Sequence, residues 1–169
     1  TPTRRQRQMC IRDRNSISGE AVGIYQVSLS SDGSRLAVGD PNENINGVNS
    51  AGKTRVFELS GNTWSQIGSD INGSQQDDYM GYATSISADG FRLATSATKL
   101  RRPSDNANTG AVKVLDWDGS DWVETGIVYG EQGGGALGSS LSLTPDGTKL
   151  VATEPSNSCL LYTSDAADE

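Results

Sequence analysis

One segment of the sequence carries side-chain oxygens at every second position, directly before Gly47. The residues are Asp40, Asn42, Asn44 and Asn46. Oxygen ligands at this spacing could surround a hard cation such as Ca²⁺. The alternative is a solvated, Asn-rich loop in which the same side chains cap turns. A later segment, 104–108, does not repeat the spacing. We therefore assign no metal or cofactor residue and keep calcium at this loop as a hypothesis.

Two groups of acidic residues could supply the paired carboxylates that glycoside hydrolysis uses. They are Asp77 with Asp78, and Asp116 with Asp118 and Asp121. The second group lies on a tight turn, where acidic residues are common, and neither group has a sequence neighbour that would raise a carboxyl pKa. The chain has no histidine, which excludes Ser-His-Asp and Cys-His catalysis and removes the commonest zinc ligand. We assign no catalytic residue.

Three other motifs resemble functional signatures, but we assign no function to them. The dipeptide Trp117-Asp118 suggests a WD40 repeat, but that repeat also has a Gly-His pair and a shorter unit of about 40–45 residues. The Gly-rich run at 130–138 lacks the Lys and Ser/Thr of a phosphate loop and is predicted to be a linker. Asn72-Gly73-Ser74 is a glycosylation sequon, which matters only in a secreted eukaryotic protein.

The composition indicates many short strands joined by turns. The 169 residues suffice for one domain, with 34% hydrophobic residues and 20 glycines. There is no apolar run near 18 residues, so membrane insertion is not expected. The net charge of −7 makes nucleic acid an unexpected partner, because an acidic surface repels phosphates.

The sequence contains an internal repeat of 57 residues, and all of the residues discussed above lie within it. Asp-Gly pairs begin at Asp32, Asp89 and Asp146, within the similar segments "SSDGSRLA", "SADGFRLA" and "TPDGTKLV". Asp-Gly is a strong hairpin signal, because Gly takes a positive φ without a Cβ clash. In the second half of the unit the offset is 58, and Trp64 and Trp122 recur in register. A periodic Trp favours a packing role between or at the edges of the units.

Each unit is predicted to form four short antiparallel strands, which is typical of a propeller blade. We predict an all-β fold, an incomplete β-propeller of about two and a half four-stranded blades. The repeats span 15–79, 80–135 and the partial unit 136–158. A propeller needs about four to eight blades, so we expect a fragment of a longer protein that is marginally stable alone and has open sheet edges.

The two ends of the chain differ from the part between them. Residues 1–14 are rich in arginine, residues 159–169 end in an acidic tail, and each segment contains one of the two cysteines. Both closely resemble the translated adapter sequence that contaminates reading frames from short-read sequencing. We predict that both flanks are artefactual and disordered, and exclude them from fold reasoning.

The segment from 20 to 155 resembles the integrin-α-like FG-GAP β-propeller family, in particular its bacterial and algal repeat proteins. The resemblance rests on "VSLSSDGSRLAVGDP" at 27–41, "GKTRVFEL" at 52–59 and "WSQIGSDING" at 64–73. The FG of the name corresponds to Met80-Gly81 and Leu137-Gly138, and the GAP to Gly39-Asp40-Pro41. The family's D-x-D-x-D-G calcium loops are not present as such.

The resemblance implies a non-catalytic scaffold that recognises a protein or glycan outside the cell or at its surface. Propeller function lies in the loops at the blade ends, here 40–52 and 98–110. The alternative is part of a propeller-fold glycosidase or lyase whose catalytic residues lie largely outside this chain. A third possibility is that the repeats are structural spacers. Further blades of the same parent chain are the remaining expected partner.

Overall fold

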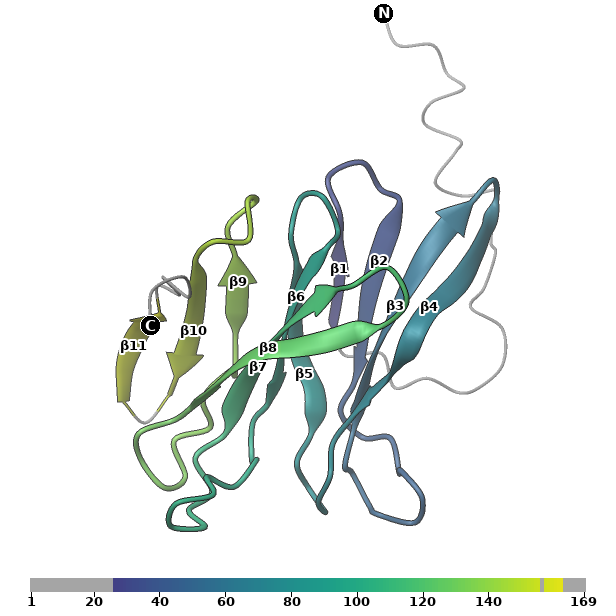
Figure 1. The fold of residues 1–169 in the computed structure, drawn as a ribbon. Helices are drawn as coiled ribbons and strands as arrows, with labels where there is room; N and C mark the ends of the chain where they lie inside the picture. Colours follow the sequence, from purple (N-terminus) through teal and green to yellow (C-terminus); the bar gives the residue numbers. More distant parts are fainter. Residues whose placement is uncertain (1–25, 156, 163–169) are drawn as a thin grey trace, which may run out of the picture.

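A computed structural model describes residues 26–155 and the backbone of residues 157–162, and every regular element in these residues is a β-strand (Figure 1). The first antiparallel sheet has the order β1 (Gln26–Leu29), β2 (Arg35–Asp40), β3 (Lys53–Ser60) and β4 (Thr63–Asn72). The second has the order β5 (Met80–Ile86), β6 (Arg92–Ala97), β7 (Ala111–Trp117) and β8 (Trp122–Tyr129). The third contains β9 (Leu141–Leu143), β10 (Leu150–Glu154) and β11 (Asn157–Tyr162). The all-β prediction is confirmed.

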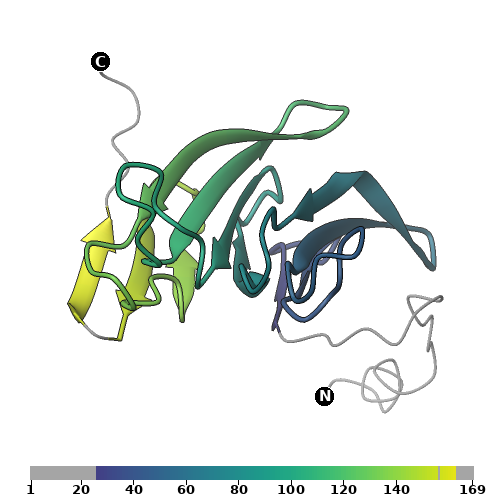
Figure 2. The same cartoon turned by 90° about the horizontal axis from the view of Figure 1, so that it is seen from below.

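The three sheets lie side by side in chain order, and we call them blades 1, 2 and 3 (Figures 1 and 2). Within each blade, consecutive strands are neighbours. Blade 3 differs from the predicted half unit, because β11 continues past residue 158 into the segment that the sequence predicts to be a disordered flank. The backbone of 157–162 pairs with β10, and this pairing satisfies backbone N–H and C=O groups.

The three Asp-Gly pairs form the same turn between the first two strands of each blade. In blade 1, the Asp32 carboxylate accepts hydrogen bonds from the Ser30 hydroxyl (2.7 Å) and the Ser34 N–H (2.9 Å), and the glycine has a φ of +73°. Asp89 and Asp146 accept the two corresponding bonds in blades 2 and 3. Since glycine adopts this φ without a steric clash, the predicted hairpins are present in all three units.

The hydrophobic core lies between the blades. Ile86 and Leu93 of blade 2 belong to one buried cluster with Ala37 and Val56 of blade 1. A second cluster joins blades 2 and 3 and contains Ala94, Val112, Leu137, Leu150 and Ala152. Because side chains alternate along a strand, Leu93 of β6 faces blade 1 and the adjacent Ala94 faces blade 3. A blade therefore covers its apolar faces only where a neighbouring blade is present.

A buried arginine joins blade 1 to blade 2 beside the Asp-Gly turns. Arg35 pairs with Glu58 of its own blade (3.1 Å) and donates to the carbonyl oxygen of Gly90 in blade 2 (3.1 Å). Its guanidinium carbon also lies 4.3 Å from the centre of the Phe91 ring, a cation–π contact. A single side chain thus combines an ion pair, a hydrogen bond and stacking across the interface.

The arrangement recurs at the next interface. Arg92 pairs with Asp116 (2.7 Å) and donates to the carbonyl oxygen of Gly147 in blade 3 (3.1 Å). Lys149 holds the same repeat position in blade 3, where its side chain is exposed and no described blade follows. In blades 1 and 2, the basic residue three positions after the Asp is therefore the residue that reaches the next blade.

Close backbone contact between blades 1 and 2 requires glycine at two facing positions. Gly81 has a φ of +85°, and a Cβ there would lie 2.9 Å from the Cα of Gly39. A Cβ on Gly39 would overlap the carbonyl oxygen of Gly81. The adjacent Met80 is fully buried in the cluster between the two blades. The Met80-Gly81 pair and the glycine at residue 39, which carry the FG-GAP resemblance, therefore meet at this interface.

Replacing Arg35 by Met should lower the free energy of unfolding by about 1–3 kcal/mol, because the interblade hydrogen bond and the ion pair are lost while the apolar stem is kept. The matched control is Lys149→Met, at the equivalent position without a described following blade, and it should change stability by less than about 0.5 kcal/mol. Urea denaturation followed by tryptophan fluorescence measures both. Equal effects would contradict the interblade role of Arg35.

Candidate functional site

The ends of the blades opposite the Asp-Gly turns carry the longest connections (Figure 1). They span residues 41–52, 73–79, 98–110 and 130–140. Since antiparallel strands alternate in direction, every second connection lies at the same end of the sheets. Both loops that the sequence singles out, 40–52 and 98–110, lie at this end, which we call the loop face.

Backbone hydrogen bonds between blades fix these loops to one another. The Tyr79 N–H donates to the carbonyl oxygen of Ser50 (3.2 Å), and at the next interface the Leu137 N–H donates to that of Thr109 (3.0 Å). Each loop between the second and third strands of a blade therefore holds the connection that enters the next blade. The loop face is built jointly by all three blades.

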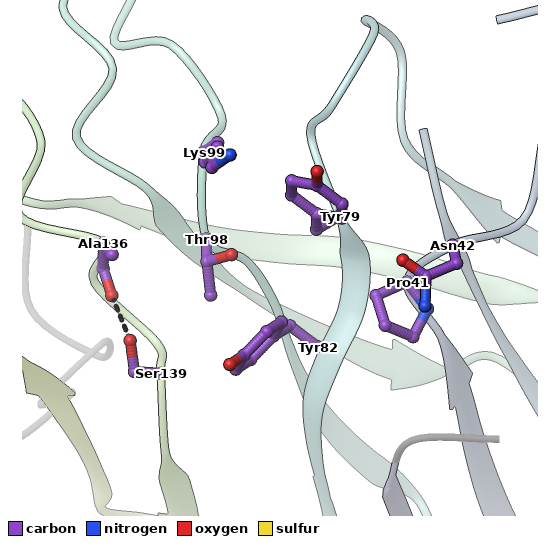
Figure 3. A pocket seen from close by; sticks show the side chains of 8 residues that line it. All are labelled: Pro41, Asn42, Tyr79, Tyr82, Thr98, Lys99, Ala136 and Ser139. Carbon is purple, nitrogen blue, oxygen red and sulfur yellow. Dashed lines mark hydrogen bonds between the residues drawn. The ribbon is translucent and has the colours of Figure 1, made fainter. Parts of the chain in front are cut away.

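A cavity of about 350 Å³ opens on the loop face where the blades meet (Figure 3). Its lining is Pro41 and Asn42 from blade 1, Tyr79, Tyr82, Thr98 and Lys99 from blade 2, and Ala136 and Ser139 from the segment entering blade 3. Many lining residues hold equivalent repeat positions, 57 residues apart, but differ in type. The volume lies within the range of small-molecule sites.

The cavity combines aromatic rings with one positive charge. Lys99 is the only charged residue among the described residues of the lining, and its Nζ lies 4.7 Å from the centre of the Tyr79 ring. The Ser139 hydroxyl donates to the carbonyl oxygen of Ala136 (2.8 Å), as Figure 3 shows. Arg101 lies exposed on the same loop as Lys99. Ring faces beside a cation and polar groups suit the binding of a ligand that carries a carboxylate.

The backbone at Tyr79 takes a conformation that is uncommon for residues other than glycine. Its φ is +55°, and Ala136, 57 residues later, has a φ of +54°. The interblade connection therefore imposes this conformation, and blade 2 uses it to present a ring where blade 3 presents only a methyl group. The sequence did not single out Tyr79, Tyr82 or Lys99. The sequence does contain a signal that could have identified them: each of the three differs in residue type from the residue 57 positions away that also lines the cavity.

The loop proposed for calcium uses one of its oxygens to cap a turn. The side-chain oxygen of Asn44 accepts a hydrogen bond from the Ser50 N–H (2.9 Å). Asp40 is buried at the end of β2, whereas Asn42 and Asn46 are exposed. Among the described residues, no three His, Cys, Asp or Glu side chains are grouped so that they could hold a metal ion. Calcium at this loop stays a hypothesis.

Asp78 stabilises the connection between blades 1 and 2. Its buried carboxylate accepts hydrogen bonds from the N–H groups of Ser74 (2.8 Å) and Gln75 (2.7 Å). The Asp77 carboxylate instead accepts a bond from the Gln76 side-chain amide (3.3 Å). The two adjacent acids therefore serve different partners, and Asp78 acts as a loop cap.

Glu154 supplies the same cap in blade 3 from a different place in the sequence. Its buried carboxylate accepts from the N–H groups of Glu131 (3.4 Å) and Gln132 (3.3 Å), which are equivalent to the two amides that Asp78 caps. The residue equivalent to Asp78 is Gly135, where a Cβ would overlap Oε1 of Glu154. One carboxylate therefore caps each connection, and the connection at 130–140 has no room for a second capping carboxylate at residue 135.

The acidic group on the outer turn of blade 2 makes structural contacts. Asp118 accepts hydrogen bonds from the N–H groups of Ser120 (2.7 Å) and Asp121 (2.8 Å), and Asp121 accepts one from the Ser69 N–H in blade 1 (2.7 Å). These backbone donors lower the pKa of both carboxyls, with Asp121 the main donor to Asp118 and Ser69 the main donor to Asp121. Asp116, the third member, forms the ion pair with Arg92.

Trp122 packs between blades, as its recurrence predicts. It is buried, its ring centre lies 5.4 Å from that of Trp117, and a Cβ on Gly68 of β4 would lie 2.8 Å from its Cδ1. Trp117 of the Trp117-Asp118 dipeptide belongs to the same packing. Trp64, the equivalent of Trp122 in blade 1, is partly exposed.

Other surface features are less suited to a ligand. The lining of a cavity of about 300 Å³ near the Asp-Gly turns includes Arg92 and Asp116, which already pair with each other, and Asp89 and Asp146, which cap their own turns. Asn72 of the sequon is exposed at the end of β4, and the Gly-rich run at 130–138 lies in the connection between blades 2 and 3. No helix in the described part of the chain is long and apolar enough to span a membrane.

Comparison with known proteins supports the architecture. No family model and no curated protein sequence matches the chain. Among solved structures, it is similar to the Cps50 (Swd1) β-propeller domain of Myceliophteria thermophila, with a TM-score of 0.57 and 13% identity over 86% of this chain. The fold is a partial β-propeller. The match covers 36% of that structure's chain, so this chain spans about a third of its length. Membership of the FG-GAP family stays a prediction from the sequence.

Exchanging the loop cap between its two positions should restore lost stability. Glu154→Ala removes the cap of blade 3 and should cost about 1–2 kcal/mol, and Gly135→Asp should cost about 1–3 kcal/mol through the clash with Glu154. The double variant recreates the blade 2 combination of Asp78 with Ala97 and should recover most of the loss. Urea denaturation of the four proteins gives the coupling energy, and additive losses would contradict the shared cap.

Acid should destabilise the fold through the Asp-Gly turns. The Ser34 N–H lowers the pKa of Asp32 to about 2, and the Thr144 hydroxyl lowers that of Asp146 to about 2, from 3.8. Because the folded-state pKa lies below the unfolded value, this stabilisation is complete above about pH 4 and is lost as the pH falls towards about 2. Urea midpoints between pH 7 and 2 should show this decline, and the double variant Asp32→Asn/Asp146→Asn should show a shallower one. An unchanged slope would contradict the assignment.

Proposed function

We propose that the chain is a non-catalytic interaction module that recognises a protein or glycan partner through its loop face. The observation that carries the proposal is the cavity at which three blades meet, with Tyr79, Tyr82 and Lys99 in its lining. The partner's recognised group is a carboxylate next to an apolar or ring surface. Lys99 pairs with the carboxylate, and the tyrosine rings pack against the adjoining surface.

The electrostatics of the loop favour an anionic ligand locally on an acidic protein. Lys99 and Arg101 are exposed on the 98–110 loop, and no carboxylate is among the described lining residues of the cavity. Arg102 is engaged with Asp105 (2.6 Å), and this pairing shapes the loop. The cation at the cavity therefore faces no competing acid in its lining, which supports recognition of a carboxylate despite the net charge of −7.

A non-catalytic role agrees with the contacts of the acidic residues. Asp118 and Asp121 both accept backbone hydrogen bonds, which lower the pKa of each carboxyl and favour the charged form. A general acid at neutral pH needs the opposite, a raised pKa. We also propose that the protein acts outside the cell or at its surface, and this location is supported by the family resemblance alone.

Binding is tested with the labelled full chain on two arrays, one of acidic and neutral glycans and one of acidic and neutral peptides. We expect binding to carboxylate-bearing members of one array, reduced at least about tenfold, or 1.4 kcal/mol, by Lys99→Met and by Tyr79→Ala. Alanine is compatible with the backbone at residue 79, because Ala136 has the same φ. The matched control Lys149→Met lies at the opposite end of the blades and should bind like the wild type. Binding that is indifferent to both cavity variants, or absent from both arrays, would refute the proposal, and turnover of a glycan would favour the enzyme alternative.

A further inference from the structure

Thr98 presents a buried polar group to the loop-face cavity. The residue is 5% exposed, and its hydroxyl makes no hydrogen bond with any residue that the structure describes. Figure 3 shows the hydroxyl oxygen on the side of Thr98 that faces the two tyrosine rings. The repeat has proline at the same position in blades 1 and 3, as Pro41 and Pro155. Blade 2 therefore replaces an apolar ring by a group that can both donate and accept a hydrogen bond in the cavity.

A buried hydroxyl without a partner favours a ligand at this place. Most buried side-chain polar atoms in proteins have a hydrogen-bond partner, and an unpaired one destabilises the folded state. Thr95, three residues earlier, follows this rule, because its hydroxyl is bonded to that of Thr54 in blade 1 (2.7 Å). A ligand in the cavity would supply the partner that the Thr98 hydroxyl lacks.

Other polar groups of the lining are also available to a ligand. Within the described part of the chain, the side-chain amide of Asn42 and the hydroxyl of Tyr79 make no hydrogen bond. The Ser139 hydroxyl donates to the carbonyl oxygen of Ala136, which leaves its own oxygen able to accept. Groups that can donate and accept in this way match a ligand that carries several hydroxyl groups.

The backbone of the lining offers little to an extended peptide. The N–H groups of Tyr79, Tyr82 and Lys99 donate to the carbonyl oxygens of Ser50, Tyr79 and Asp78 in that order. A peptide that adds to a sheet edge needs free backbone groups there, and these three N–H groups are already used. Recognition through side chains favours a sugar over a peptide.

Uncommon backbone conformations also point to the loop face as the functional end of the blades. Six non-glycine residues in the described part of the chain have a positive φ, and all of them lie in the loop-face connections: Asn46, Ser50, Asp77, Tyr79, Asn106 and Ala136. Such conformations cost free energy and gather at ligand sites. The Asp-Gly turns at the opposite end instead have glycine at their positive φ.

We propose that the cavity binds a sugar acid, a pyranose ring that carries a carboxylate, and that the Thr98 hydroxyl bonds to one of the sugar hydroxyls. The inference rests on the proposed function, because it names the ligand class of the same cavity. A tyrosine ring packs against the C–H face of the sugar, Lys99 pairs with the carboxylate, and Asn42 bonds to a further hydroxyl. The cavity volume of about 350 Å³ is within the range of sites for small ligands.

Calorimetry of the full chain with matched pairs of sugars tests the ligand class. The probes are the methyl glycosides of glucuronic and galacturonic acid, each beside the neutral glucoside or galactoside. We expect at least one acid to bind at least about tenfold more tightly than its neutral counterpart. Lys99→Met should abolish this difference, and the control Lys149→Met, at the opposite end of the blades, should keep it. Equal binding of the acidic and neutral forms by the wild type would overturn the proposal.

The variant Thr98→Val tests the role of the buried hydroxyl. It should weaken binding of the sugar acid by about three- to tenfold, because one hydrogen bond to the ligand is lost. It should not lower the urea midpoint, because the hydroxyl has no internal partner to lose. The matched variant Thr95→Val should lower the midpoint, since it leaves the buried Thr54 hydroxyl unpaired. An unchanged affinity for the sugar acid in Thr98→Val would overturn the assignment of Thr98.

A peptide probe separates a failure of this inference from a failure of the proposed function. The probe is a short peptide in which an aspartate follows a tyrosine, measured with the wild type and with Lys99→Met. Binding of this peptide that depends on Lys99, without binding of any sugar acid, would overturn the inference and leave the proposed function in place. Binding of neither the peptide nor a sugar acid would overturn both.

Discussion

Burial between neighbouring blades is the constraint on which the rest of the structure depends. The apolar clusters lie between sheets, and Arg35 and Arg92 tie each sheet to the turn of the next. A single four-stranded meander leaves both faces uncovered, so its stability derives from its neighbours. The loop-face cavity depends on the same constraint, because its walls come from three blades that hold their positions only while the interfaces between them are packed.

The sequence predicted the repeat, the hairpins and the all-β class because these depend on local chemistry. An Asp-Gly pair forms its turn from residues within a few positions of it, so the pattern is visible without knowledge of neighbours. The cavity could not be predicted, because Tyr79, Lys99 and Asn42 come together only through the packing of blades and an unusual φ at Tyr79. The role of Arg35 was likewise hidden, since its partner Gly90 is 55 residues away.

The acidic residues show why residue type alone overstates catalytic potential. Asp78, Asp118 and Asp121 each accept backbone N–H donors. The turn contacts of Asp118 agree with the tight turn expected from the sequence, whereas the bond from Ser69 to Asp121 joins residues 52 positions apart and is not visible in the sequence. In a fold of short strands and many turns, a large share of the carboxylates is used to satisfy backbone donors that no strand partner reaches. In such a chain, exposed cations and aromatic rings at a junction between blades are more informative about a functional site than carboxylates are.

The carboxylate that Asp78 provides in one connection and Glu154 in another means that the blades are not interchangeable parts. A transplanted blade 3 would bring Glu154 on its strand but leave behind the amides at residues 131 and 132, which precede that blade in the chain. The connection that precedes the transplanted blade would then have either two capping carboxylates in a space for one or no capping carboxylate. A gene duplication or a design that copies such units must therefore have its boundaries within a blade. Each copied unit then contains both a connection and the strand whose carboxylate caps that connection.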